Sequence, residues 1–121
     1  MGSLTLELPW PAAALSPNSR DRWASIKARK SAKTYAWGMT KAAMGPLGIA
    51  MGAMKSPVAV RIVFHPAVDR GRDLDNFQAS MKAALDGIAL ALGIDDKHFR
   101  PVSSFGEKRN PACVVVTLAA A

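Results

Sequence analysis

Residues 58–92 constrain the fold most strongly, because they join the clearest strand pattern of the chain to a helical one. Val58–Phe64 is rich in β-branched residues and alternates as a half-buried strand does. From about Asp75 to Leu92 apolar residues recur at helical spacing, and Gly93 ends that pattern. We therefore expect a strand followed by an amphipathic helix that packs on a sheet.

The flanking segments predict three further strands and a long helix. Leu4–Leu8 alternates and is stopped by Pro9. Ser16 or Ser19 is expected to cap a helix running to about Met44, followed by a loop over Met44–Met54. The remaining predicted strands are Phe99–Glu107 and Cys113–Leu118. The order β-α-β-α-β-β predicts an α/β (α+β) fold with a mixed sheet and two main helices on one side.

Length and composition predict one domain over residues 1–121. The single cysteine, Cys113, excludes an intramolecular disulfide and is expected to be a small buried residue on a strand. No segment approaches the roughly 20 apolar residues of a membrane span, and the first residues lack the pattern of a signal peptide. We expect a cytoplasmic protein with no membrane partner.

The net charge of +7 favours a polyanionic partner. Between Arg20 and Lys41 the only acid is Asp21, whereas six of the nine acids lie between Asp69 and Asp96. The expected phosphate contacts on the basic helix are Lys27, Lys30 and Lys33. The alternative for these lysines is an ordinary solvated helix face. Trp23 and Trp37 share a face of this helix, and Trp23 is expected to be a core or dimer contact.

Two acids two residues apart, Asp73 and Asp75, lie where the central strand gives way to the helix. Together with Asp96, or Asp95, they can supply the oxygen ligands that Mg²⁺ prefers, and such a site serves phosphodiester hydrolysis. The alternative is structural: Asp75 and Gln78 have the spacing of a capping box, and Asp95-Asp96 can be a turn.

The chain resembles the RusA-type Holliday-junction resolvases over nearly its whole length. The matching segments are Leu8-Pro9-Trp10-Pro11, Leu15-Ser16-Pro17-Asn18 with Arg20 and Trp23, Asp69-Arg70-Gly71-Arg72-Asp73-Leu74-Asp75-Asn76, Leu85-Asp86-Gly87 and Ile94-Asp95-Asp96. The resemblance implies a homodimeric nuclease, common in phages and prophages, that nicks four-way DNA junctions symmetrically with Mg²⁺ or Mn²⁺. It assigns the catalytic and metal-binding acids to Asp73, Asp75 and Asp96.

The chain departs from the family's pattern at Ala79, where the motif carries a catalytic lysine. Lys82 lies one helical turn further on and is expected to reach back toward Asp75 and stabilise phosphate charge. The alternative is a surface pair between Lys82 and Asp86. Arg70 and Arg72 flank the acids and are expected to contact phosphates. No small-molecule substrate is expected.

Two other functions remain open at this point. Ala79 favours a catalytically weak relative that binds branched DNA without cutting it. An Asp-x-Asp pair also occurs in other metal-dependent phosphotransfer enzymes.

Overall fold

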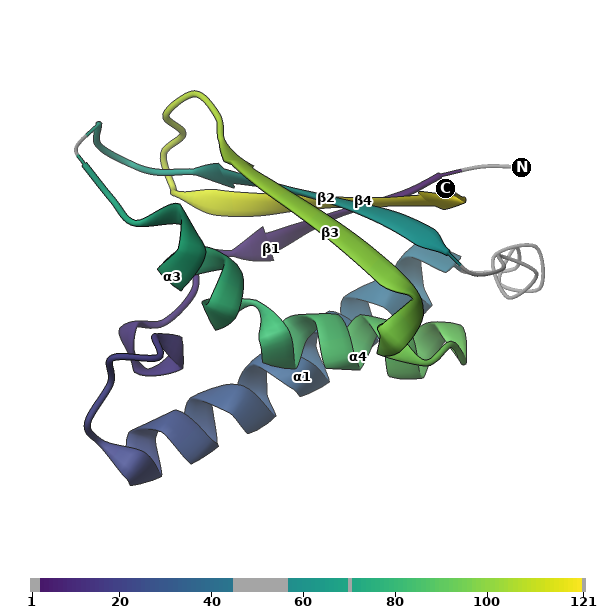
Figure 1. Cartoon of the computed structure of the whole chain (residues 1–121), viewed down its shortest axis with the longest axis horizontal. Helices are drawn as coiled ribbons and strands as arrows, with labels where there is room; N and C mark the ends of the chain where they lie inside the picture. Colours follow the sequence, from purple (N-terminus) through teal and green to yellow (C-terminus); the bar gives the residue numbers. More distant parts are fainter. Residues whose placement is uncertain (1–2, 45–56, 70, 121) are drawn as a thin grey trace.

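The computed structural model describes residues 3–44, 57–69 and 71–120, which form a four-stranded mixed sheet with the helices on one face (Figure 1). The strands are β1 (Leu4–Pro9), β2 (Val58–His65), β3 (Phe99–Phe105) and β4 (Cys113–Ala120). The helices are α1 (Arg22–Met44), α3 (Leu74–Ser80) and α4 (Lys82–Leu92), with the short 3₁₀ turns η1 (Ala13–Leu15) and η3 (Asp96–His98). The predicted order and fold class are confirmed. Apart from Met44, which ends α1, the predicted loop over Met44–Met54 lies outside the described residues, as does Arg70.

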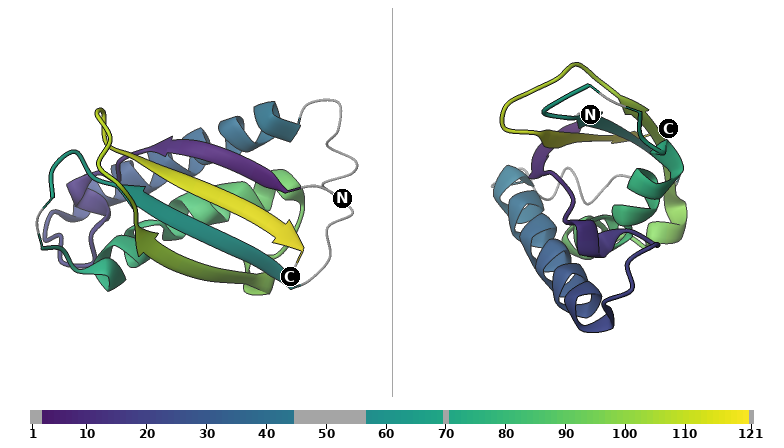
Figure 2. Two further views of the ribbon diagram at one scale, coloured as in Figure 1. Left: turned by 90° about the horizontal axis from the view of Figure 1, so that it is seen from above. Right: turned by 90° about the vertical axis from the view of Figure 1, so that its left-hand side faces the viewer.

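The sheet has the order β1-β4-β2-β3, in which β2 and β3 are parallel and the other pairs are antiparallel. The segment joining β2 to β3 carries α3 and α4 beneath the sheet, as a parallel pair requires. Figure 2 shows α1 and α4 along the same face of the sheet, while no described helix covers the other face.

The core lies between this face and the helices. Strand residues at every second position are buried, including Leu6, Ile62 and Val116. Helix α4 covers them with Ile88 and Leu92. This alternation is the pattern that predicted the strands.

Helix α1 packs against α4 through small residues. Its buried side chains are Ser25, Ala36 and Thr40. Gly87 of α4 lies directly against the backbone of Lys33. Trp23 shares its face with Trp37 as predicted, but the expectation that Trp23 is a core contact of the subunit is wrong: 81% of it is exposed. At helical spacing the side chain of Trp23 points away from the buried side of α1, which carries Ser25, Ala36 and Thr40.

The start of α1 also differs from the prediction. Asp21 caps the helix: its Oδ1 accepts a hydrogen bond from the backbone N–H of Ala24 at 2.9 Å. Ser16 and Ser19, the predicted caps, lie in the turn that precedes the helix. The hydroxyl of Ser16 accepts from the backbone N–H of Asn18 instead.

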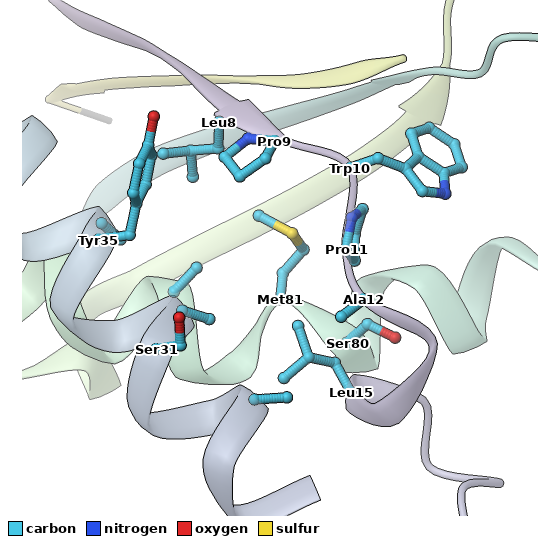
Figure 3. Close-up of a pocket in the computed structure, with 14 residues that line it drawn as sticks. Leu8, Pro9, Trp10, Pro11, Ala12, Leu15, Ser31, Tyr35, Ser80 and Met81 are labelled. Carbon is cyan, nitrogen blue, oxygen red and sulfur yellow. The ribbon is translucent and has the colours of Figure 1, made fainter. Parts of the chain in front are cut away.

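The second predicted helix is interrupted at Met81, which separates α3 from α4. The Ser80 hydroxyl donates to the carbonyl of Asn76 at 2.8 Å, a bond that tends to bend helices. Met81 is 3% exposed and points into an apolar hollow of about 190 Å³ between α1, the end of β1 and the helix break (Figure 3). Burial of Met81 in that space accounts for the change of direction.

Candidate functional site

Asp73 and Asp75 lie at the start of α3, just beyond the C-terminal end of β2. Asp73 is the N-cap, and its Oδ1 accepts from the backbone N–H groups of Asp75 at 3.0 Å and Asn76 at 3.4 Å. Asp75 lies in the first turn, where a carboxylate is favoured by the helix dipole. Both carboxylates belong to exposed residues.

The predicted alternative of a capping box at Asp75 is wrong by two residues, since the cap is Asp73. Gln78 does not reach back to the helix start; its Oε1 accepts the hydroxyl hydrogen of Ser103 at 2.6 Å. This bond ties α3 to β3, which fixes the orientation of the acidic end of the helix.

A hollow of about 390 Å³ opens beside Asp73 and is lined by Trp10, Arg72, Asn76 and Phe77 among others. The Arg72 guanidinium carbon lies 5.6 Å from the centroid of the Trp10 ring, and Nη1 donates to the carbonyl of Val68 at 2.9 Å. Trp10 in turn packs on Phe77, with ring centroids 5.1 Å apart. Nothing in the sequence signalled this support for Arg72, because Trp10 lies far away along the chain.

Lys82 lies between two carboxylates on the surface of α4. Its Nζ donates to Asp96 Oδ2 at 2.5 Å and to Asp86 Oδ1 at 2.9 Å. The hydrogen bond to Asp96, with a smaller contribution from Asp86, raises the pKa of Lys82. The hydrogen bond from Lys82 lowers the pKa of Asp96. The ammonium and this carboxylate therefore both stay charged over a wide pH range.

Of the two contacts predicted for Lys82, the structure shows the surface pair with Asp86 and not the reach toward Asp75. The pairing with Asp86 at i+4 is present, but Lys82 also bonds Asp96 from the turn before β3. It does not extend back toward Asp75 in this structure, because the break at Met81 redirects the chain at that point. Asp95 has a local role: it caps η3 by accepting from the backbone N–H of Lys97.

The predicted metal ligands fall into two separate places. Asp73 follows the C-terminal end of β2, whereas Asp96 precedes the N-terminal end of β3, and the two strands are parallel and in register. Strand β3 is seven residues long. At about 3.3 Å per residue, the C-terminal end of β2 and the N-terminal end of β3 therefore lie roughly 20 Å apart. Among residues 3–44, 57–69 and 71–120, no three His, Cys, Asp or Glu side chains are grouped so that they could share a metal ion.

The ligand type of these acids therefore suits Mg²⁺, but their positions do not bring all three to one ion. The two carboxylates of Asp73 and Asp75 are ligands of the type that Mg²⁺ uses, and Mg²⁺ is often held by one or two carboxylates plus water. A three-carboxylate site that includes Asp96 does not form within one subunit in this conformation.

The predicted phosphate contacts on α1 lie together on its outer surface. Lys27, Lys30 and Lys33 are all exposed. Lys27 and Lys30 line one shallow hollow with Tyr35, and Lys33 lines another with Trp37. Helix α1 contains no acidic residue.

Two further residues, Cys113 and His65, have structural roles. Cys113 is buried on β4, as predicted. His65, at the end of β2, is also buried, and its Nδ1–H donates to the carbonyl of Glu107 at 2.8 Å.

The fold and these sites define a small α+β protein with a basic helix and acids at two ends of its helical layer. No protein-family model matches the chain. A protein of Xylella fastidiosa (strain Temecula1), named only as uncharacterized, is 39% identical over 117 residues, covering 94% of this chain and 74% of that protein. The chain belongs to the same family as this Xylella protein.

Among solved structures, a thiamine-monophosphate kinase from Stenotrophomonas maltophilia aligns with 97% of this chain at 12% identity and a TM-score of 0.35. The chain spans 29% of the length of that kinase. A TM-score of this size does not establish a common fold. In the described part of the chain, no helix is both long enough and apolar enough to cross a bilayer.

Proposed function

We propose that this protein is a magnesium-dependent endodeoxyribonuclease that acts in the cytoplasm as a homodimer and resolves four-way DNA junctions by paired symmetric nicks. The proposal starts from the resemblance to the RusA-type resolvases. The observation that supports it best is the contact between Lys82 and Asp96, which joins two of the four expected catalytic residues from separate segments of the chain.

Each group has a distinct task in this proposal. Asp73 and Asp75 would hold the cation, which would supply an activated water and neutralise phosphate charge. Lys82 would turn from Asp96 toward a phosphate oxygen of the scissile strand and stabilise the charge that develops there. Arg72, supported by the Trp10 ring, would position the adjacent phosphate.

The homodimer has a direct bearing on the geometry of the acids. Because Asp73 and Asp96 lie at opposite ends of the β2–β3 pair, we propose that Asp96 completes the acidic site of the other subunit. A two-fold axis then generates two equivalent sites, which suits a junction with matching strand symmetry.

The first experiment is cleavage of a labelled four-way junction with Mg²⁺ by the wild type and three variants. Asp75→Asn removes the charge of a metal ligand, and Lys82→Ala removes the ammonium group; both are expected to abolish nicking and to retain junction binding. Glu7→Gln is the matched control, since it removes a carboxylate from an exposed position on β1. If Asp75→Asn cuts as fast as the control, the assignment of the metal site is wrong.

Mixing two inactive variants tests the shared site. If Asp75 of one subunit works with Asp96 of the other, a heterodimer of Asp75→Asn and Asp96→Asn has one intact site and regains nicking of one strand. If both acids act within one subunit, that heterodimer has no intact site and stays inactive. Each variant assayed alone should not nick the junction, because both sites of its homodimer then lack an acid.

The alternative function is binding of branched DNA without cleavage. It is favoured by Ala79, which stands where the motif of the RusA-type resolvases carries a catalytic lysine. Structure-selective binding of a junction, with no products under Mg²⁺ or Mn²⁺, would establish this alternative.

A further inference from the structure

The outer surface of α1 carries tryptophans and lysines on the same stripe. We call this surface the Trp–Lys face; it consists of Trp23, Lys27, Lys30, Lys33, Trp37 and Lys41, all exposed. At 3.6 residues per turn, Trp23, Lys30, Trp37 and Lys41 point within about 40° of one another. The Lys41 ammonium lies 6.0 Å from the centroid of the Trp37 ring.

Both tryptophans are available to a partner. Trp23 is 81% exposed and Trp37 is 41% exposed, although tryptophan is among the residues that are highly buried on average. The opposite side of α1 packs on α4 and β1 through small residues, so the indoles have no place in the core of the subunit.

The charge of this face is not balanced within the subunit. Helix α1 has no acid, and Asp21 is engaged as its cap. None of the ion pairs among the described residues includes Lys27, Lys30 or Lys33. An unbalanced basic surface of this kind favours a polyanionic partner.

A second copy of this chain does not fit the face. Two α1 helices packed on each other would bring lysines against lysines at the middle of the contact, with no acid to offset them. A bilayer surface fits poorly too, because interfacial helices keep their charged and apolar residues on opposite faces. Here Lys30 lies between Trp23 and Trp37 on one stripe.

Interleaved aromatic and basic side chains suit single-stranded nucleic acid, whose bases stack on aromatic rings while its phosphates pair with cations. Trp23 and Trp37 are fourteen residues apart, or about 21 Å along the helix axis. That distance corresponds to at most about six nucleotides at the 3.4 Å spacing of a stacked strand.

We propose that the Trp–Lys face binds single-stranded nucleic acid, with unpaired bases stacked on Trp23 and Trp37 and the intervening phosphates held by Lys27, Lys30 and Lys33. The inference goes beyond the proposed nuclease function. It depends on α1 alone and stands whether or not the acids bind a metal.

The test is the binding of a fluorescein-labelled oligothymidylate of about 12 nucleotides, measured by polarisation without divalent metal. Trp23→Ala and Trp37→Ala are each expected to weaken binding by about 10-fold, the size of one lost stacking contact. Trp23→Phe should retain most of the affinity. Val102→Ala, which shortens an exposed apolar side chain on β3, is the matched control and should change nothing.

The salt dependence separates stacking from charge. Lys30→Gln is expected to reduce the slope of log Kd against log salt by about 0.7, because it removes one phosphate contact on a single strand. The tryptophan variants should weaken binding with the slope unchanged. Intrinsic fluorescence gives a second readout: the oligonucleotide should quench the wild type, and the double tryptophan variant should keep an unquenched signal from Trp10.

Three results would overturn the proposal. One is unchanged affinity in both Trp→Ala variants. Another is sedimentation that shows a wild-type dimer becoming monomeric in these variants without nucleic acid, since the face would then be a contact between copies. A third is loss of co-sedimentation with vesicles of phosphatidylcholine and phosphatidylglycerol in the same variants, with binding of the oligonucleotide intact. Absence of junction cleavage would not bear on it.

Discussion

Replacement of Gly87 by alanine tests the packing of the two long helices. A Cβ at this position would lie 2.2 Å from the carbonyl oxygen of Lys33, 3.0 Å from its carbonyl carbon and 3.2 Å from its Cα. All three atoms belong to the backbone of α1, so no side chain can turn away. The helices must separate by about 1 Å to restore normal contact distances.

The size of the effect follows from two opposing contributions. Alanine in place of glycine within a helix stabilises it by about 0.5–1 kcal/mol. Overpacking typically costs about 1–3 kcal/mol, and the upper end applies when the obstacle is a backbone. We expect Gly87→Ala to lower the free energy of unfolding by about 2 kcal/mol.

Gly38→Ala is the matched control, because Gly38 lies within α1 and a Cβ there meets nothing within 4 Å. This variant should gain about 0.5–1 kcal/mol from helix propensity alone. The difference between the two variants, about 3 kcal/mol, then isolates the steric cost.

Urea denaturation followed by far-UV circular dichroism measures both variants. Gly87→Ala should lower the midpoint with an unchanged m value, and Gly38→Ala should raise it. Equal shifts in the two variants would refute the close crossing of α1 and α4. The outcome also bears on the Leu85-Asp86-Gly87 motif, because the close contact with the backbone of Lys33 gives its glycine a packing role.

Three other predictions concern single side chains. Asp73→Ala should cost about 1 kcal/mol in urea denaturation because α3 loses its cap, whereas Asp73→Asn keeps the cap and should abolish only nicking; equal stability of both would contradict the capping role. Lys82→Met should destabilise slightly at neutral pH. Because Lys82 lowers the pKa of Asp96, this difference should be lost as pH falls through that lowered pKa. Because the pKa of Lys82 is raised, the difference should persist through neutral pH and be lost only as pH rises through that raised pKa; a loss near neutrality would contradict the pairing. His65→Phe removes the donor of the part-buried hydrogen bond to the carbonyl of Glu107 and should cost about 1 kcal/mol, with thermal unfolding as the readout.

The elements of the sheet could be predicted because alternation is a direct consequence of strand geometry. Leu4, Leu6 and Leu8 point to one face, and so do Val58, Val60 and Ile62. Because that face is apolar, the helices pack on it, and the fold therefore has two layers. The four strands begin at the predicted residues, and their C-terminal ends differ from the predicted ones by one or two residues.

The orientation of α1 could not be predicted in the same way. Helical spacing places Trp23, Ile26 and Trp37 together but does not say whether their face meets the core. The deciding factor is the close approach of Gly87 to Lys33, a contact between residues far apart in sequence. Small residues therefore form the buried face, contrary to the usual preference for large ones.

The candidate site was only partly accessible from the sequence for a related reason. The position of Asp73 and Asp75 at a helix start follows from local pattern. The partnership of Lys82 with Asp96 depends on the break at Met81 and on the path of the chain into β3. No local spacing encodes that path.

The placement of β4 between β1 and β2 affects the order in which the domain can assemble. β1 leads the described elements and β4 follows all the others, yet Leu4 pairs with Leu118. During synthesis, β1 cannot pair until β4 has been made, because β4 is its neighbour in the sheet. Strands β2 and β3 and the α3–α4 segment between them can associate earlier. Pairings so distant along the chain slow folding. Until β4 pairs with them, the open edges of β1 and β2 are the surfaces most prone to pairing with other chains.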